Sequence, residues 1–350
     1  MKIRRKKLIK GILTLISALV VVILAASAIG SADISISDCA RILLSKVPLI
    51  GASVDLSEIK PSHISILLKI RLPRILLSAL IGSALSVSGV AYQGIFKNPM
   101  ADPFVLGISS GAALGATFVI VTGAKFGILG LSSISVGAFA GALAAAFTVY
   151  NIGRIGNRTP VVTLLLAGIA VNYFLSSMIS IVMSFNRDRM ENIVFWTMGS
   201  VTTATWMQIA VALVPILLGT AYLLTCARDL NALALGEDSA KGLGVDSEKA
   251  KKTILIVASI VTASAVSVSG IIGFVGLIIP HVVRILSGPD HRTLLPFSIL
   301  TGAIFLVLSD TLARTLVVPA ELPIGIITSV FGAPYFLYLL YRNKLRSNVR

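Results

Sequence analysis

Long apolar runs dominate this sequence and restrict what it can fold into. A hydrocarbon core of about 30 Å is crossed by roughly 20 residues of α-helix, and runs of that kind recur along the whole chain. The 350 residues are 56% hydrophobic and only 13% charged, which is more apolar surface than a soluble domain buries. The sequence therefore predicts an all-α protein that crosses a membrane many times.

Ten spans fit the apolar pattern. The run from Ile254 to Leu286 is too long for one crossing, because a helix rises 1.5 Å per residue. Since Gly270, Gly273 and Gly276 weaken its middle, we divide it into two crossings. The predicted spans are then residues 11–29, 75–92, 105–122, 128–150, 161–185, 206–226, 254–272, 275–286, 294–312 and 324–341.

Basic residues agree with this count. Six Lys and Arg lie in residues 2–10 and four in residues 342–350, and the positive-inside rule places both groups in the cytoplasm. An even number of spans satisfies both ends, so we expect a multi-pass protein of the cell membrane with cytoplasmic termini. The net charge of +15 then reflects topology and needs no nucleic-acid partner.

The domain organisation is simple. The longest polar stretches, residues 31–69 outside and 227–252 inside, are too short for an enzyme domain, so we expect one transmembrane domain over residues 1–350. A signal peptide ending at Ala26-Ser27-Ala28 is the alternative for the first span, although the run is long enough to cross. The similarity of residues 84–90 to residues 265–271 suggests an inverted repeat, with chance similarity of Ser/Ala/Val-rich helices as the alternative.

Several kinds of chemistry find no support. The sequence has no Gly-x-x-x-x-Gly-Lys phosphate loop, so we expect no ATP hydrolysis by that route. His63, His281 and His291 lack metal-ligand spacing, and Cys39 and Cys226 fall on opposite sides of the membrane. The near absence of mid-membrane ionisable residues disfavours an ion-coupled carrier, and no plausible catalytic constellation is present.

Small and polar residues inside the spans suggest packing. The glycines at 107, 111, 115, 137 and 141 have a spacing that lets helices approach closely. Asn172 either bonds a neighbouring helix or lines an aqueous path. Asp310 and Arg314 stand four residues apart, as an ion pair within one helix would.

One polar segment, residues 230–245, lies between long apolar helices. It mixes glycines, acids, bases and small residues and is predicted to sit in the cytoplasm, where a partner protein can touch it. Leucines in it can bury apolar area, while Gly236, Gly242 and Gly244 permit tight turns between short helices.

The sequence resembles the FecCD-type permeases of binding-protein-dependent ABC importers over about residues 71–340. The matching strings are long and occur in order: Arg71–Arg74, Ser88-Gly89, Gln93-Gly94, Asn98–Pro103, Leu106–Ala112, Gly273–His281, Gly288–Arg292 and Glu321–Gly325.

The resemblance implies a ten-helix, type II inverted-repeat permease that pairs with a second copy of itself. Two cytoplasmic ATPase subunits, which bind ATP and Mg²⁺, and an extracytoplasmic binding protein are its expected partners, and this chain itself holds no cofactor and no metal. The segment 230–250 is expected to couple to the ATPase through Leu233, Leu235, Gly236, Glu237, Ala240, Leu243 and Gly244.

The resemblance also suggests roles outside that segment. Arg71, Arg74 and Arg314 resemble positions that dock acidic residues of the binding protein, which the planar guanidinium suits. Interfacial anchoring and the Asp310 pair are the alternatives. The fifth and tenth spans are expected to line the path, and the expected path and gate residues are Pro160, Val161, Val162 and Asn172.

The cargo expected from this resemblance is a metal chelate, with a ferric siderophore first and cobalamin or haem as alternatives. Where a cobalamin importer has small hydroxyl residues before its Leu-Leu-Leu-Ala-Gly string, this chain has Val161 and Val162. That departure weakens cobalamin as the cargo. The predicted mechanism is alternating access driven by ATP, and an ATP-independent carrier is the competing class.

Overall fold

The computed structural model describes residues 2–30, 32, 34–47, 51–127, 130–317 and 319–347. Every regular element in those ranges is helical, which confirms the predicted fold class. The elements are α1 (Lys2–Ala28), α2 (Ile36–Leu44), η1 (Gly51–Ser53), α3 (Pro61–Ile66), η2 (Leu67–Arg71), α4 (Leu72–Phe96), η3 (Pro103–Leu106), α5 (Ile108–Thr122), α6 (Ser133–Gly153), α7 (Val161–Phe185), η4 (Arg187–Arg189), α8 (Met190–Thr197), α9 (Trp206–Thr225), α10 (Ala227–Ala234), α11 (Glu237–Gly242), α12 (Ser247–Ser269), α13 (Val275–Ser287), α14 (His291–Ala313) and α15 (Ile324–Ser347).

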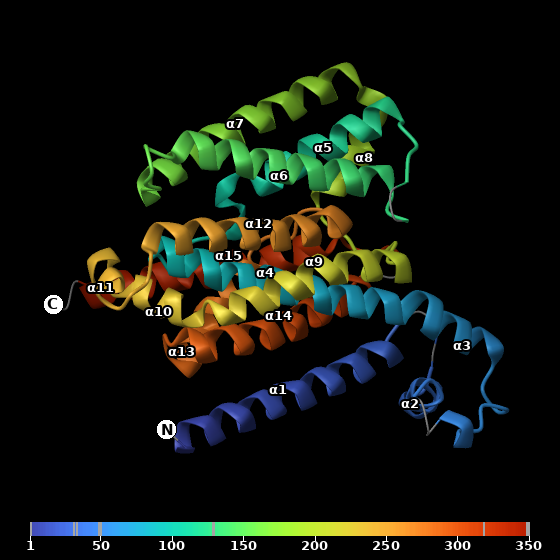
Figure 1. Ribbon diagram of the computed structural model, residues 1–350. Helices are drawn as coiled ribbons and strands as arrows, with labels where there is room; N and C mark the ends of the chain where they lie inside the picture. The colour runs from blue at the N-terminus through green and yellow to red at the C-terminus, as the bar shows by residue number, and fades with distance from the viewer. Residues whose placement is uncertain are drawn as a thin grey trace.

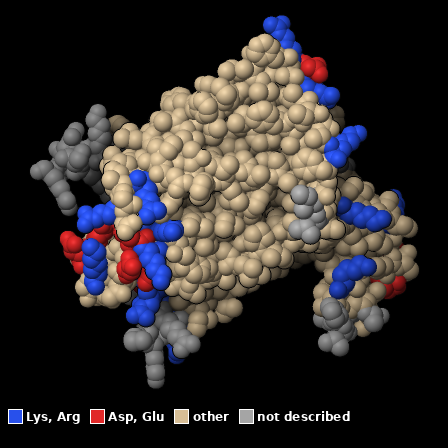
Figure 2. Space-filling model, turned by 45° about the horizontal axis from the view of Figure 1, so that its top comes forward, with Lys and Arg blue, Asp and Glu red and all other residues tan. Residues whose placement is uncertain are grey.

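Ten apolar helices of the described chain correspond to the predicted spans. Seven are long and apolar enough to cross a membrane, namely Lys6–Ala28, Pro61–Phe96, Ser133–Gly153, Val161–Phe185, Trp206–Thr225, Ser247–Ser269 and His291–Ala313. Three are shorter: Ile108–Thr122, Val275–Ser287 and Ile324–Leu339. Figure 2 shows charged side chains gathered at two opposite ends of the visible face, with a broad band without charge between them. That band has the character expected of a lipid-facing surface.

The helix boundaries follow local backbone chemistry. The division of the long run is confirmed, because α12 ends at Ser269, Gly270 has a φ of 69°, and α13 begins at Val275. The prediction that the third span begins at residue 105 is wrong by three residues, since Pro103–Leu106 is a 3-10 turn and Gly107 (φ 76°) breaks the chain before α5. Ile128, the predicted start of the fourth span, lies outside the described residues, as do residues 348–350.

Helix α4 forms the centre of the bundle and is buried along most of its length. It packs against α14, α12, α13 and α9, while α5, α6 and α7 form a group on one side and α1 lies at the periphery beside α14 (Figure 1). Glycines allow the closest approaches: a Cβ atom at Gly89 would overlap the Gly276 carbonyl oxygen, and one at Gly82 would overlap that of Gly302.

The predicted glycine packing is confirmed between α5 and α6. A Cβ at Gly111 would overlap the Gly141 carbonyl oxygen, and one at Gly115 would overlap that of Gly137. Gly107 differs, because its Cβ would meet only side chains at 3.5–3.6 Å. Its positive φ, rather than helix packing, is what requires glycine there.

The two ends of the bundle carry different elements. Helix α1 begins and α15 ends on the side where α10 and α11 lie, and α2, α3 and α8 lie on the opposite side (Figure 1). The first segment of the suspected repeat lies in α4, and the second begins in α12 and ends just beyond it. Helices α4 and α12 pack together through a Ser88 Oγ bond to the Ala258 carbonyl (3.3 Å) and a Tyr92–Ser259 hydroxyl contact (2.9 Å). The repeat relation itself remains a prediction.

Candidate functional site

The polar segment forms two short helices joined at glycine. Helix α10 ends at Ala234, and Gly236 has a φ of 119°, a backbone conformation that other residues rarely adopt. Helix α11 follows, and Gly244 (φ 81°) turns the chain toward α12. Figure 2 shows a mixed cluster of acidic and basic side chains at one end of the molecule, on the side where Figure 1 places α10 and α11.

The segment has a buried side and an exposed side. Ala232, Leu233 and Ala240 form a small core against Val245 and Ala250. Leu233 is therefore unavailable to a partner in this conformation, contrary to the expectation that it buries area there. Leu235 and Leu243 are 69% and 65% exposed, so this side of the segment offers apolar surface that a partner could cover.

Asn231 fixes the segment to the bundle through three polar contacts with Asp290 and His291, where α14 begins. Asn231 donates its side-chain N–H to the Asp290 carboxylate at 2.8 Å. Its oxygen accepts the His291 backbone N–H at 3.0 Å and lies 2.8 Å from His291 Nδ1. These bonds hold α10 against the start of α14.

A second connection runs to α12. Lys251 Nζ forms an ion pair with Glu237 of α11 and lies 3.2 Å from Glu248. The hydrogen bond from Lys251 holds the pKa of the Glu237 carboxyl below its usual value. Glu248 also accepts hydrogen bonds from the backbone N–H and the hydroxyl of Thr159, each at 2.9 Å.

Two cavities flank the predicted path helices. The first, of about 820 Å³, lies between α5 and α7, and its polar lining includes Asp102, Ser110, Asn172 and Thr197. The second, of about 740 Å³, lies along α15. Thr197, at the end of α8, and Ile271 border both cavities.

The predicted gate residues lie at the beginning of α7. Pro160 is the residue before the helix, Val161 is half-buried, and the side chain of Val162 is exposed. Asn172 bonds a neighbouring helix, because its oxygen accepts a hydrogen bond from the Ser110 hydroxyl of α5 at 2.5 Å. It also borders the first cavity, and its place on an aqueous path stays a prediction.

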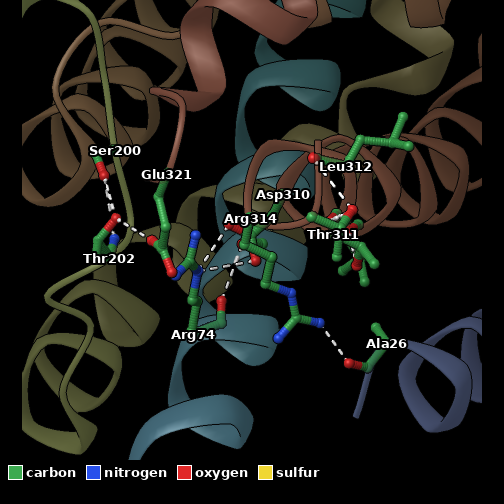
Figure 3. Close-up of polar contacts among 12 residues, drawn as sticks. Ala26, Arg74, Ser200, Thr202, Asp310, Thr311, Leu312, Arg314 and Glu321 are labelled. Atoms are coloured by element: carbon green, nitrogen blue, oxygen red, sulfur yellow. Dashed lines mark hydrogen bonds and ion pairs between the residues drawn. The ribbon is translucent and has the colours of Figure 1, made fainter. Parts of the chain in front are cut away.

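At the opposite end of the bundle, Arg74 is buried between two carboxylates (Figure 3). Its Nε donates to both oxygens of Asp310 at 2.9 and 3.1 Å, and its Nη1 donates to Glu321 at 2.7 Å. The suggested ion pair of Asp310 with Arg314 is therefore wrong. The carboxylate turns instead to α4, where the buried Arg74 guanidinium shares its Nε–H between the two Asp310 oxygens.

The other two arginines bind the end of α1. Arg71 donates to the carbonyls of Ser27 (2.7 Å), Ala28 (3.0 Å) and Ala32 (2.6 Å). Arg314 donates to the carbonyl of Ala26 (Figure 3). Because the last carbonyls of a helix have no partner within it, these side chains cap α1. All three guanidinium groups are largely buried and engaged within the chain.

Metal-binding side chains do not gather in the described part of the chain: no three His, Cys, Asp or Glu residues there are placed to hold an ion. Cys39 and Cys226 are both buried and unpaired. His63, His281 and His291 lie apart, in α3, α13 and α14.

Comparison with known proteins gives the family. The model of the FecCD transport family matches residues 18–342. The chain belongs to the FecCD transport family.

Its FecCD relatives are permeases. It is 48% identical to the cobalamin import system permease protein BtuC of Halobacterium salinarum, over 79% of this chain and 74% of that protein. It is 45% identical to the hemin transport system permease protein HmuU of Yersinia pestis, over 79% of this chain and 83% of that protein. A solved metal-chelate type ABC transporter in an inward-facing conformation aligns with a TM-score of 0.80 and 32% identity, covering 95% of this chain and 99% of that one.

As a FecCD permease, the chain has polar residues that sequence reasoning missed. Thr159, Glu248 and Lys251 belong to no recognisable motif. The only sequence signal was the pair of lysines at residues 251–252, because a lysine where a helix enters the membrane needs a partner for its charge. Glu321 lies in one of the matching strings, so its position was available although its bond to Arg74 was not. Asp102 likewise lies in a matching string, and only the fold places it on a cavity wall.

Proposed function

We propose that this chain is the permease subunit of a binding-protein-dependent ABC importer that moves a metal chelate into the cell. The observation that carries the proposal is the α10–α11 segment, which presents Leu235 and Leu243 outward while its polar side chains fix it to α12 and α14. The sequence has no phosphate loop of its own. We therefore assign ATP and Mg²⁺ binding to a partner subunit, and we place that partner on this surface.

The proposed assembly contains two such ATPase subunits and a second copy of this chain. Helix α7 supports the homodimer because its exposed face is apolar: Val162, Leu166, Ile169, Tyr173 and Phe174 are all exposed in the single chain. Helix α15 exposes Val330, Phe331 and Leu337 in the same way. Helix α7 borders the first cavity and α15 the second, so we place the path where a dimer would cover these two faces. In this arrangement both termini are cytoplasmic.

A metal chelate is the proposed cargo, with a ferric siderophore tested first and cobalamin and haem as the alternatives. The relatives that carry cobalamin and hemin, and the solved metal-chelate transporter, support the class. The cavity lining is mostly apolar with scattered hydroxyls and one carboxylate. Such a lining suits a large chelate whose metal is already coordinated, because it offers no cluster of ligands for a bare ion.

The proposed site for the external binding protein is the end of the bundle that carries Arg71, Arg74 and Arg314. Acidic residues of that partner would exchange with the carboxylate and carbonyl oxygens that now occupy the guanidinium groups. Glu321 is the partner most easily exchanged, because its side chain is 37% exposed whereas that of Asp310 is 1% exposed.

The proposed mechanism is alternating access. Closure of the ATPase subunits on ATP moves α10 and α11, and the path helices α7 and α15 reorient between the two sides of the membrane. ATP can shift the equilibrium between the states open to either side of the membrane only if the partners bind one state more tightly than the other.

The test is uptake by proteoliposomes that hold the permease, its neighbouring ATPase and an external binding protein. We expect accumulation of a ferric siderophore, cobalamin or haem only when ATP is present inside. An ATPase variant that binds but does not hydrolyse ATP is the control. Accumulation that persists without the ATPase would refute the proposal and favour a carrier that works without ATP.

A further inference from the structure

A buried lysine connects the α10–α11 segment with the beginning of α7. Lys251 lies in the second turn of α12 with 2% of its surface exposed. Its ammonium group bonds the Glu237 carboxylate of α11 and lies 3.2 Å from Glu248 Oε1. A lone ammonium at such a position would be costly, and the two carboxylates compensate it.

Glu248 uses its second oxygen for a different element. Oε2 accepts from both the backbone N–H and the hydroxyl of Thr159, each at 2.9 Å. Thr159 is itself buried and directly precedes Pro160, after which α7 begins. The chain of contacts thus runs from Glu237 to Lys251, then to Glu248, then to Thr159.

Each of these contacts involves at least one charged group. Hydrogen bonds of that kind are shorter and stronger than neutral ones. The ion pair is also sheltered from water at its centre, because the Lys251 side chain is 3% exposed while that of Glu237 is 48% exposed. A displacement of α11 therefore pulls on a sheltered connection whose far end is the backbone of the residue before the gate.

The chemistry of these contacts favours a role in transmitting movement between α11 and α7 over a role in stabilising the fold alone. A buried ion pair is weak evidence for stability, since well-packed apolar residues of similar volume often stabilise a fold as well or better. A polar link has another property: its hydrogen bonds are directional, so movement at one end changes the geometry at the other. The neighbouring Lys252 is exposed and forms no hydrogen bond or ion pair with the described residues.

We propose that Lys251 and Glu248 are positioning residues that transmit movement of α11 to Thr159 and so to the start of α7. This inference rests on the proposed function, in which α10 and α11 seat on the ATPase and α7 lines the path. It adds two residues of α12 to the coupling apparatus and names Thr159 as the point where the movement reaches the gate.

The test uses the assembled transporter in proteoliposomes and compares ATP hydrolysis with chelate accumulation in the same preparation. For Glu248→Leu and Lys251→Met we expect the ATPase to remain bound and active, while the chelate accumulated per ATP hydrolysed falls on the order of tenfold. Thr159→Val should give a smaller loss, because the backbone N–H still bonds Glu248. Lys252→Met is the matched control and should leave the ratio unchanged.

Glu248→Gln guards against a variant that fails to fold. Its amide oxygen can still accept from Thr159, but the charge that binds Lys251 is gone, so we expect an intermediate ratio. A second readout follows the movement of the start of α7 directly through a spin label on the exposed residue Asn157 in each of the two copies of the proposed homodimer, since both native cysteines are buried. ATP should change the distance between the two labels in the unaltered transporter and not in Glu248→Leu.

The relay is overturned if the variants lose uptake and hydrolysis in equal proportion, or if the labelled distance in Glu248→Leu still responds to ATP. Failure of the proposed function looks different. In that case the unaltered complex itself shows no ATP-dependent accumulation, and the relay falls with it.

Discussion

Arg74 and Asp310 form a buried ion pair across 236 residues of sequence, in which Arg74 Nε lies 2.9 and 3.1 Å from the two carboxylate oxygens. Both side chains are buried. The pair joins α4 at the centre of the bundle to α14, close to the point where Arg314 caps α1. Three helices therefore depend on one small polar cluster.

Removing one partner of this pair should destabilise the protein strongly. Arg74→Met leaves the Asp310 carboxylate buried without its donor, and breaking a buried pair in this way costs about 3–5 kcal/mol. Glu321 can turn to water and adds little to that cost. Thermal unfolding in detergent measures the effect, and the double variant Arg74→Met/Asp310→Leu should lose less than the sum of the single variants. Additive losses would contradict the pairing.

The exposed and buried leucines of the α10–α11 segment should respond differently to substitution. Leu235→Ser and Leu243→Ser should reduce the ATPase that purifies with the permease while leaving the unfolding temperature nearly unchanged, because both side chains lie at the surface. Leu233→Ser should instead lower the stability by about 2–5 kcal/mol, as truncation of a buried leucine does. Equal loss of ATPase binding at a preserved unfolding temperature in all three would refute the assignment of the exposed side.

Helix boundaries are the part of the fold that the sequence predicted well. The seventh and eighth spans separate at Gly270, which adopts a φ of 69°, and α7 covers the same residues, 161–185, as the predicted fifth span. Both boundaries depend on local chemistry. Glycine permits the left-handed turn, and Pro160 precedes the first helical residue of α7.

Pairings between helices were beyond sequence reasoning. The expected partner of Asp310 was Arg314, four residues along the same helix, whereas the observed partner is Arg74 of α4. Likewise Leu233 and Leu235 are two residues apart, yet one faces the segment's own core and the other faces water. Neither choice is encoded locally, because each depends on which helix lies alongside in the folded chain.

The close approach of α4 and α13 at Gly89 predicts that this glycine cannot be replaced by a larger residue without loss of stability. In Gly89→Ala the new Cβ would overlap the Gly276 carbonyl oxygen, so α4 and α13 must separate, and overpacking of this kind costs about 1–3 kcal/mol. Gly273→Ala is the control, because a Cβ there meets nothing within 4 Å. We expect a lower unfolding temperature in detergent only for Gly89→Ala, and equal unfolding temperatures for the two variants would contradict the close approach.

As the pH rises from about 4 to about 6, the contribution of Asp102 to the stability of the permease should be lost. Burial raises the pKa of this carboxyl to about 6, although the backbone N–H of Phe104 opposes the shift. A carboxyl whose pKa is raised in the folded state stabilises that state most below its unfolded pKa of about 4, and the contribution is lost as the pH rises through 6. Asp102→Asn keeps an acceptor for Phe104 but cannot ionise. Its unfolding temperature should therefore change less between pH 4.5 and pH 7 than that of the unaltered protein, measured in the same detergent at about the same ionic strength. Parallel pH profiles for the two proteins would show that Asp102 does not titrate in this range.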